Sequence, residues 1–556
     1  MKAKPSCQTV ASVLAAQGLR DAVISPGSRN APFILALDDE RTISKYPVID
    51  ERSAAFIALG MAQVSRRPVL LCCTSGTALL NYAPAVAEAY YQGIPLIVVS
   101  ADRPSEWIDQ DDSQTLRQFE ALRNYVKASF DIPDFSADDE TLCWYANRTA
   151  NDAYLTSIDG RPGPVHINMH FREPLTSSHT PIAAQRTVCA TDTDSCLPPE
   201  AIKRLTAAAA DKRILIVAGQ YPPSNRINRA IAVLSHLPNV AVWAESVANI
   251  HIPGIVHCID RTLLAIDPED EAYRPDIVIS FGGALVSRKA KAFLRSLDHC
   301  ENWSVAYRRD RLADPFMKLT RVIETRPEIF LPHFANALCR QHPSGTYAET
   351  WREAAVRASN RHDAKIADAQ WSALRAFDYI MSHIPSKVNL QLSNGTAIRY
   401  AQLFSNRDIH ASYCNRGVSG IDGSTSTALG AAMQYANPTL LITGDMSMAY
   451  DIGALACSFV SPDLKIIVIN NGGGEIFRFI PSTSRLPCRE HYFSVPPVLP
   501  LAGLAKAYGF NYFHCASERA LKASLPDLFA PSLRPSIMEV VVDPDISART
   551  LSEYFK

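Results

Sequence analysis

Short apolar runs alternate with helix-like segments rich in small residues along most of the chain. In the first third, apolar runs at 21–25, 69–73 and 95–100 are predicted strands, with a helix over 11–16 and a further strand over 163–168. Strands that alternate with helices at this spacing predict a parallel sheet covered by helices on both faces.

The same alternation recurs twice more, after a polar stretch at 176–199 that is predicted to be a linker. A polar, helix-forming stretch at 340–370 separates the second region from the third. Further strands are predicted at 213–219, 240–246, 276–283, 439–443, 465–470 and 537–543. The predicted fold class is therefore α/β, with three consecutive parallel-sheet α/β domains at 1–180, 195–340 and 365–556.

One segment beginning at Val69 and another beginning at Thr439 share the same order of features. Each has an apolar strand, a glycine turn, a small-residue helix and a second strand flanked by proline. Two explanations are open. Any two strand–helix–strand units have this order, or the first and third regions are related domains separated by another.

Composition narrows the classes of protein. The 556 residues are 47% hydrophobic and 20% charged, and 55 basic against 56 acidic residues leave a net charge of -1. This balance excludes a bulk polycation built for nucleic acid and a highly charged disordered chain. The 13 cysteines are scattered without a C-x-x-C pair, which argues against a disulfide framework or a structural zinc site. With no signal-peptide core and no run of 18 apolar residues, we expect a cytoplasmic protein without a transmembrane segment.

Polar residues follow two successive apolar strands of the third region. Gly444 and Asp445 end one run, Asn470 and Asn471 end the next, and 24 residues lie between Asp445 and Asn470. Both pairs are expected at the carboxyl ends of neighbouring parallel strands, where open α/β sheets bind ligands. A carboxylate, an amide oxygen and a backbone carbonyl suit Mg²⁺ completed by phosphate oxygens, and glycines at 472–474 let the backbone approach a phosphate. The alternative is a pair of ordinary Asp and Asn turns.

This spacing resembles the signature of thiamine diphosphate-dependent enzymes, a Gly-Asp-Gly followed one crossover later by Asn-Asn. Here Met446 replaces the second glycine of the signature. The resemblance implies thiamine diphosphate as cofactor, with Mg²⁺, or Mn²⁺ in its place, as the metal. It implies Asp445, Asn471 and the backbone carbonyl of Gly473 as the metal ligands.

The resemblance also implies a catalytic role for Glu51, which follows a short apolar strand and opens an Ala-rich helix. Its carboxyl group would exchange a proton with N1′ of the cofactor's pyrimidine ring. Burial would raise its pKa to suit that work. The alternative is an acidic residue that only stabilises a helix start.

Four further motifs narrow the resemblance. Ser-Pro-Gly-Ser-Arg-Asn at 25–30, Thr-Ser-Gly-Thr-Ala at 74–78, Ala-Asp-Arg-Pro at 101–104 and Asn-Arg-Gly-Val-Ser-Gly-Ile-Asp-Gly at 415–423 occur in this order. Together they resemble the 2-succinyl-5-enolpyruvyl-6-hydroxy-3-cyclohexene-1-carboxylate synthase family of transferases over both outer regions. The resemblance implies decarboxylation of 2-oxoglutarate and 1,4-addition of the succinyl-semialdehyde carbanion to isochorismate, in menaquinone biosynthesis. It also implies a homodimer with active sites at the interface, pairing into a homotetramer.

Binding residues follow from the resemblance position by position. The implied cofactor residues are Glu51, Asn394, Gly395, Ile421, Gly444, Asp445, Ser447, Asn471, Gly473, Gly474, Ile476 and Phe477. The implied substrate residues are Ser28, Arg29, Arg103, Gln114, Arg288, Lys289, Arg399 and Arg416. Six of these eight are cationic, as two dicarboxylate substrates require, although any one alone is more ordinary as a solvated surface residue. Ile421, Ile476 and Phe477 would wedge the cofactor into its bent shape or else form ordinary core.

Two positions depart from the family pattern. Gly395 stands where a hydroxyl commonly contacts the diphosphate, so that contact is expected to pass to the backbone or to Thr396. Arg288 and Lys289 stand in the reverse of the commonest order, which keeps the charge but not the bidentate geometry.

Two rival functions are open. One is another thiamine diphosphate-dependent carboligase or 2-oxoacid decarboxylase, although the chain lacks the His-His pair found in pyruvate decarboxylases. The other is a non-catalytic binding protein of the same fold. The joint presence of Glu51, Asp445 and Asn471 argues against the second, which needs none of them.

Overall fold

The computed structural model describes residues 2–176, 185–191, 193, 195–307, 312–405 and 409–556. The chain divides into two compact units, each built from three segments. The first unit contains Met1–Asp192, Gly417–Ala436 and Tyr450–Leu464, and the second contains Thr193–Arg416, Asn437–Ala449 and Lys465–Lys556. Residues 177–184, 192 and 194 of the predicted linker lie outside the described residues, and its described residues before Pro199 belong to no helix or strand.

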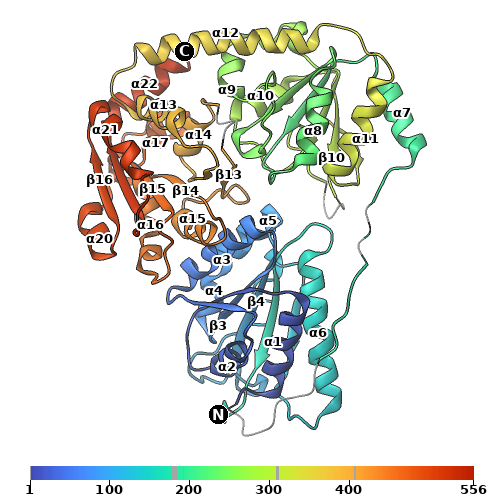
Figure 1. The fold of residues 1–556 in the computed structure, drawn as a ribbon, viewed down its shortest axis with the longest axis vertical. Coiled ribbons are helices and arrows are strands. Elements are labelled where there is room, and N and C mark those ends of the chain that lie inside the picture. Colours follow the sequence, from blue (N-terminus) through green and yellow to red (C-terminus); the bar gives the residue numbers. More distant parts are fainter. Residues whose placement is uncertain (1, 177–184, 192, 194, 308–311, 406–408) are drawn as a thin grey trace. The chain divides into compact units, whose positions relative to one another are not determined.

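The first unit is built around a six-stranded sheet (Figure 1) with the order β2-β1-β3-β4-β6-β5. All neighbouring strands are parallel, so each connection needs a crossover, which helices supply. The strands are β1 (Asp21–Ile24), β2 (Ser44–Pro47), β3 (Val69–Cys73), β4 (Leu96–Asp102), β5 (Ser129–Ile132) and β6 (Val165–His170). The helices are α1 (Pro5–Gln17), α2 (Ala31–Asp39), α3 (Glu51–Ser65), α4 (Thr77–Asn81), α5 (Ala83–Gln92) and α6 (Glu140–Ile158). Strands β1, β3, β4 and β6 are buried along their whole length, as expected for a sheet covered on both faces.

A central five-stranded sheet opens the second unit, with the order β11-β10-β9-β7-β8 and parallel neighbours throughout. Its strands are β7 (Ile214–Ala218), β8 (Val240–Ala244), β9 (Ile277–Phe281), β10 (Glu301–Val305) and β11 (Leu319–Ile323). Its helices are α7 (Pro199–Ala209), α8 (Asn225–Leu234), α9 (Ile259–Thr262), α10 (Arg288–Ser296) and α11 (Pro327–Cys339). The long helix α12 (Tyr347–Ala367) follows and occupies the stretch predicted to be helical at 340–370.

The third sheet has six strands in the order β13-β12-β14-β15-β17-β16. They are β12 (Asn389–Leu392), β13 (Ala411–Cys414), β14 (Thr439–Gly444), β15 (Leu464–Asn470), β16 (Asn511–Cys515) and β17 (Ser536–Val541). The helices of this part of the chain are α13 (Ala373–His383), α14 (Ala397–Ala401), α15 (Ser424–Met433), α16 (Asp445–Tyr450), α17 (Glu475–Phe479), α18 (Pro481–Ser484), α19 (Arg489–Tyr492), α20 (Leu501–Ala507), α21 (Glu518–Leu528) and α22 (Pro544–Tyr554). Of these, α15 belongs to the first unit.

The first and third sheets share one topology. Counted from the first strand of each, both have the order 2-1-3-4-6-5. A single strand–helix–strand unit does not dictate the order of six strands, so this agreement supports the explanation that the two regions are related domains. The α/β class with three parallel sheets is confirmed, and the domain limits at 1–180, 195–340 and 365–556 stay a prediction.

Inside the first unit, α3 and α15 cross at a distance that only glycine permits. A Cβ atom added to Gly60 would lie 2.0 Å from the carbonyl oxygen of Thr427, and one added to Gly430 would lie 2.0 Å from that of Ile57. The two glycines therefore face each other's helix backbone. Because α3 begins at Glu51, this crossing fixes the axis of the helix that carries the candidate catalytic residue.

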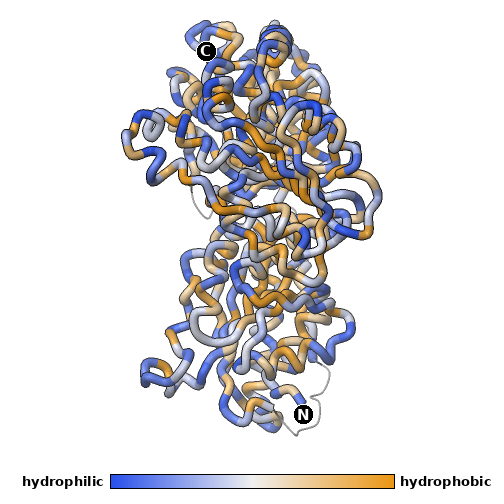
Figure 2. The backbone as a smooth tube through the Cα atoms, turned by 90° about the vertical axis from the view of Figure 1, so that its left-hand side faces the viewer, coloured by the Kyte–Doolittle hydropathy of each residue, from blue (hydrophilic) through white to orange (hydrophobic). Residues whose placement is uncertain are grey.

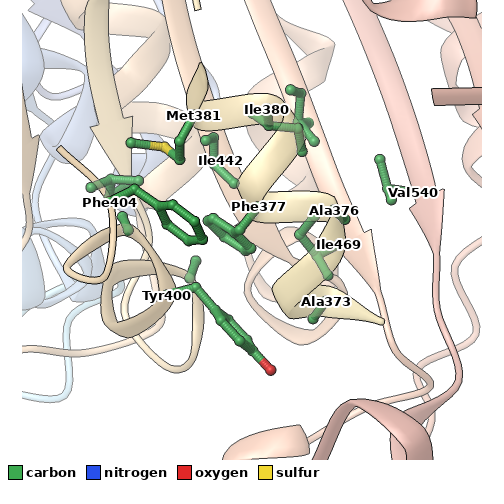
Figure 3. Packing of buried hydrophobic residues seen from close by; sticks show 14 of the residues in the cluster. Ala373, Ala376, Phe377, Ile380, Met381, Tyr400, Phe404, Ile442, Ile469 and Val540 are labelled. Carbon is green, nitrogen blue, oxygen red and sulfur yellow. The ribbon is translucent and has the colours of Figure 1, made fainter. Parts of the chain in front are cut away.

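Buried apolar side chains fill the space between each sheet and its helices. Figure 2 shows hydrophobic residues along the inner segments and hydrophilic residues on the outer turns. In the third sheet's core, Phe377 of α13 stacks on Tyr400 of α14 with ring centroids 5.0 Å apart, and Ile442 and Met381 pack nearby (Figure 3). None of the helices among the described residues combines the length and apolar character needed to cross a bilayer.

Candidate active site

The third sheet places two polar pairs at the ends of neighbouring strands. β14 ends at Gly444, β15 ends at Asn470, and the two strands are adjacent in the sheet. The Asp445 Oδ2 atom accepts a hydrogen bond from the backbone N–H of Gly473 at 2.8 Å. The loop after β15 therefore closes onto the carboxylate that follows β14, and the structure brings Asp445, Asn471 and Gly473 together.

The oxygen atoms at this point fit a hard cation. The Oδ1 atom of Asn471 is buried and has no hydrogen-bond partner among the described residues, because Nδ2 is the atom that donates to Glu475, at 2.7 Å. Burial raises the pKa of the Asp445 carboxyl, while backbone N–H groups, first that of Met446, act in the opposite direction. An unpaired amide oxygen beside a buried carboxyl group costs free energy that a cation such as Mg²⁺ or Mn²⁺ offsets.

Amide and backbone oxygens are needed for this cation. Across the described parts of the chain, no group of three or more His, Cys, Asp or Glu side chains could hold a metal. A cation at Asp445 would therefore take Asn471 and a backbone carbonyl as further ligands. Phosphate oxygens of a bound ligand and water would complete its coordination shell.

The loop after β15 requires glycine. Gly472, Gly473 and Gly474 all have positive φ, at 73°, 91° and 62°. A Cβ atom on Gly473 would lie 2.4 Å from the carbonyl oxygen of Val495, and one on Gly474 would lie 2.5 Å from that of Phe493. Gly444, in contrast, has open space where a Cβ would project. This loop can bring its backbone N–H groups to a phosphate, as its sequence predicts.

Asn394 lies at the end of β12 and holds the neighbouring β13 segment in place. Its Nδ2 donates to the carbonyl of Asn415 at 2.6 Å, and its Oδ1 accepts from Arg416 at 2.9 Å. Gly395 has a φ of 92° and open space beside it. The Thr396 hydroxyl donates to Glu475 at 3.2 Å, so its one proton is already used. Of the two expected routes for the diphosphate contact, this hydrogen bond favours the backbone over the Thr396 hydroxyl, and the contact itself stays a prediction.

The remaining cofactor positions are less uniform. Ser447 is buried in α16, whereas Ile476 and Phe477 are half-buried in α17, where Phe477 packs on Phe493 at 5.4 Å between ring centroids. Intermediate burial leaves both side chains partly accessible, and their predicted role in wedging the cofactor stays a prediction. Ile421 belongs to the first unit and is 36% exposed.

Glu475 is a residue that the sequence reasoning missed. Its carboxyl group is buried, accepts hydrogen bonds from Asn471 and Thr396, and accepts another from the Tyr400 hydroxyl at 2.6 Å. Burial raises its pKa to about 7, against these three hydrogen bonds. A glutamate that opens a helix carries no distinctive sequence signal, so only its place beside Asn471 identifies it.

Glu51 is the first residue of α3. Asp50 precedes the helix and caps it by accepting from the backbone N–H of Arg52 at 3.0 Å. The Glu51 charge contributes to the raised pKa values of the buried Cys73 thiol and Tyr82 hydroxyl, after burial itself, which places Glu51 near the end of β3. Glu51 is half-buried in the single chain, and its predicted catalytic role in a buried setting stays a prediction.

Arg29 follows the turn after β1 and is 6% exposed. It donates to the carbonyl of Phe171 at 3.1 Å and pairs with Glu173 at 3.2 Å. Burial lowers its pKa first, and the charge of Arg103 lowers it further, so the two arginines are electrostatic neighbours. The adjacent Ser28 is exposed.

Arg103 follows β4 and is held by the loop that carries Gln114. It pairs with Asp112 at 3.2 Å and donates to the carbonyl of Ser113 at 2.8 Å, while its Nε is buried without a partner among the described residues. Gln114 is exposed, has a φ of 54° and lies beside Gly76. The four substrate positions of the first unit therefore form one group at the carboxyl ends of β1, β3 and β4.

A buried polar network behind Arg103 was also missed. Asp102 accepts from the backbone N–H of Arg103 at 2.8 Å and from Asn168 at 2.9 Å. His170 contacts the Arg103 carbonyl through Nδ1 and Asp131 through Nε2, at 2.5 and 3.0 Å. The network fixes the backbone from which the Arg103 side chain projects. Its residues come from three strands that are far apart in the sequence, so no local sequence motif predicts the network.

The second unit holds the other four substrate positions. Arg399 on α14 has a lowered pKa, first because it is buried and then because Arg288 and Arg416 are close. Arg288 and Lys289 are exposed at the start of α10, and Lys289 lies over the ring of Phe555 at 5.3 Å. A carboxylate bound here would offset the repulsion that Arg288 and Arg416 exert on the charge of Arg399, which is compatible with the predicted substrate role.

Two buried acids, neither of them predicted, hold the α10 end of this group. Glu245, at the end of β8, accepts backbone N–H groups of Val286 and Ser287, both at 2.7 Å, and burial raises its pKa to about 7. Asp260 accepts from the Ser287 hydroxyl and offsets part of the charge of Arg399. These contacts fix the turn that leads into Arg288.

Comparison with known proteins identifies the family of this chain. Residues 7–121 match the family model described as "Thiamine pyrophosphate enzyme, N-terminal TPP binding domain", where thiamine pyrophosphate is another name for thiamine diphosphate. The chain is similar to 2-succinyl-5-enolpyruvyl-6-hydroxy-3-cyclohexene-1-carboxylate synthases from Porphyromonas gingivalis (41% identity, 97% of this chain and 94% of the relative), Flavobacterium psychrophilum (36%, 99% and 98%) and Bacteroides fragilis (35%, 99% and 98%). The chain belongs to the 2-succinyl-5-enolpyruvyl-6-hydroxy-3-cyclohexene-1-carboxylate synthase family of thiamine diphosphate-dependent enzymes.

Proposed function

We propose that this enzyme decarboxylates 2-oxoglutarate and transfers the resulting four-carbon succinyl-semialdehyde unit to isochorismate by 1,4-addition. The product is 2-succinyl-5-enolpyruvyl-6-hydroxy-3-cyclohexene-1-carboxylate, an intermediate of menaquinone biosynthesis. The observation that carries the proposal is the meeting of Asp445, Asn471 and Gly473 at the strand ends of a chain in this family. The two groups of arginines add the charge that dicarboxylate substrates need.

Thiamine diphosphate, when bound with Mg²⁺ or Mn²⁺, supplies the electron sink that decarboxylation of a 2-oxoacid requires. Asp445, Asn471 and the Gly473 carbonyl would hold the metal, and the glycines of the loop after β15 would receive the diphosphate. Glu51 would hold a proton at its carboxyl group and exchange it with the cofactor's pyrimidine ring.

The cationic residues bind and orient the substrates. The C1 carboxylate of 2-oxoglutarate leaves as CO₂ when its bond to C2 breaks, and a new carbon–carbon bond then joins C2 to isochorismate. The distal carboxylate of the donor and both carboxylates of the acceptor remain charged throughout. They require arginine contacts such as those of Arg103, Arg399 and Arg416, with Ser28, Arg29, Gln114, Arg288 and Lys289 beside them.

Product analysis tests this function. Purified protein with thiamine diphosphate and Mg²⁺ is given 2-oxoglutarate, isochorismate or both, and CO₂ and the adduct are measured by mass spectrometry. We expect the adduct only with both substrates. Release of CO₂ without an adduct when both are present would make the enzyme a simple decarboxylase and refute the proposal.

Glu51→Gln is the matched variant, because it removes the proton but keeps the size of the side chain. The variant should keep most of its affinity for the cofactor, and its turnover rate should fall by roughly 10²–10⁴-fold. Near-normal turnover in this variant would refute the catalytic role of Glu51 but not the proposed overall reaction.

We further propose that the protein acts in the cytoplasm as a homodimer with active sites at the subunit interface, which pairs into a homotetramer. This proposal rests on the family, whose residues matching Glu51 and Asp445 serve one site from different subunits. Sedimentation of the purified protein tests it, and a monomer that is fully active would refute it.

A further inference from the structure

We propose that Glu475 is a positioning residue that orients the Asn471 amide so that its oxygen faces the metal. The inference rests on the proposed function, because it concerns the same metal site. Glu475 opens α17, four residues after Asn471, and is 2% exposed. It is not among the implied metal ligands, and it would act only through Asn471.

The hydrogen bonds around Glu475 decide which way the amide points. Asn471 Nδ2 donates to Glu475 Oε2 at 2.7 Å, and an amide nitrogen can only donate. The Oδ1 atom is then directed away from Glu475, and it is buried without a partner among the described residues. The opposite orientation would set two oxygens against each other at Glu475 and would point an N–H₂ group at a cation. An acceptor at position 475 therefore selects the one orientation that can ligate a metal.

Glu475 is itself held from two directions. The Tyr400 hydroxyl donates to its Oε1 at 2.6 Å, and the Thr396 hydroxyl donates to its Oε2 at 3.2 Å. Tyr400 is fully buried and stacked on Phe377, with its hydroxyl at the edge of the apolar cluster (Figure 3), so the core fixes the position of this donor. Glu475 thus connects the segment after β12 to the loop after β15, the two segments that carry the expected diphosphate and metal contacts.

Metal affinity tests this role separately from turnover. Mn²⁺ binding is titrated by electron paramagnetic resonance in the presence of thiamine diphosphate, with wild-type protein, Glu475→Met and Glu475→Gln. Glu475→Met keeps an unbranched side chain of similar length but offers no acceptor, and it should weaken Mn²⁺ binding by roughly 10–100-fold, as loss of an outer contact to a ligand does. Glu475→Gln can still accept from Asn471 through its amide oxygen, and it should stay within about threefold of wild type.

Wild-type Mn²⁺ affinity in Glu475→Met would overturn the inference, and so would equal losses in Glu475→Met and Glu475→Gln. Asp445→Ala is the positive control for loss of the metal. If wild-type protein with thiamine diphosphate binds no Mn²⁺, the proposed function itself fails and the inference fails with it. Unchanged affinity in Glu475→Met beside a wild type that binds overturns the inference alone.

A second pair of variants keeps the test valid if Glu475→Met does not fold. Asn471→Asp places a carboxylate against Glu475, where two oxygens repel each other. Combining it with Glu475→Gln supplies an N–H₂ donor to the new carboxylate. The double variant should therefore bind Mn²⁺ more tightly than Asn471→Asp alone, and equal or weaker binding would overturn the inference.

Discussion

Replacing Gly60 by alanine should damage both stability and activity, because α3 and α15 have no room for a methyl group at their crossing. The added Cβ would lie 2.0 Å from the Thr427 carbonyl oxygen, whereas ordinary contact begins at 3.4 Å, so one helix must move by about 1.4 Å. Overpacking a close-packed site costs about 1–3 kcal/mol of stability. Because the contact here is with backbone, which cannot move aside as a side chain can, we expect a cost of about 3 kcal/mol. Alanine recovers about 1 kcal/mol of helix propensity. The net loss of about 2 kcal/mol corresponds to a Tm lower by about 4–8 °C for a unit of 150–250 residues.

Differential scanning calorimetry and the adduct assay measure the two effects. Because α3 carries Glu51, a displacement of this size should also lower the rate by about 10²-fold. Gly503→Ala is the matched control, since Gly503 is exposed in α20 with nothing within 4 Å, and it should raise stability by about 0.4–1 kcal/mol. A Gly60→Ala protein with the Tm and rate of wild type would refute the account of this helix crossing.

Two further predictions concern charge. Burial disfavours the charged form of His170, but hydrogen bonds to Asp131 and to a backbone carbonyl outweigh this effect and raise its pKa from 6.5 to about 9. The protonated side chain therefore stabilises the fold fully below pH 6.5. This contribution, up to about 3 kcal/mol, is lost as the pH rises to 9. In His170→Gln, the urea concentration at the unfolding midpoint should depend less on pH between 6.5 and 9. The same pH dependence as in wild type would contradict this. Burial and the charges of Arg288 and Arg416 disfavour the charged form of Arg399, so Arg399→Met should have a Tm equal to or higher than that of wild type. The KM of at least one substrate should rise about 10–150-fold. Unchanged KM values, measured with each substrate varied separately, would contradict a binding role.

Strands with continuous apolar runs could be predicted from the sequence, and the partly exposed ones could not. β3, at Val69–Cys73, is buried throughout and was predicted with its observed limits. β2, β11 and β16 are partly exposed, so they lack a continuous apolar run, and no strand was predicted there. A sheet edge is half solvated, which removes the pattern on which the prediction depends.

The site divides in the same physical way. Asp445 and Asn471 could be predicted to meet because strand ends and crossover length place them on one edge of a sheet. Glu475, Glu245 and His170 could not, because each acts through partners that only the folded chain brings within hydrogen-bond distance. The sequence pattern thus predicts groups at strand ends, and it does not indicate residues whose role depends on hydrogen bonds to distant parts of the chain.

The crossing of α3 and α15 also affects how the protein is made. The largest segment of the first unit ends at Asp192, but α15, which covers α3, ends at Met433, about 240 residues later. At roughly 5–20 residues per second of synthesis, the nascent chain waits about 10–50 s before α15 can cover α3. During that time the α3 face around Gly60 has no partner, and a fragment ending at Asp192 would keep it open permanently. The first unit therefore cannot form this helix crossing until more than three quarters of the chain has been synthesised.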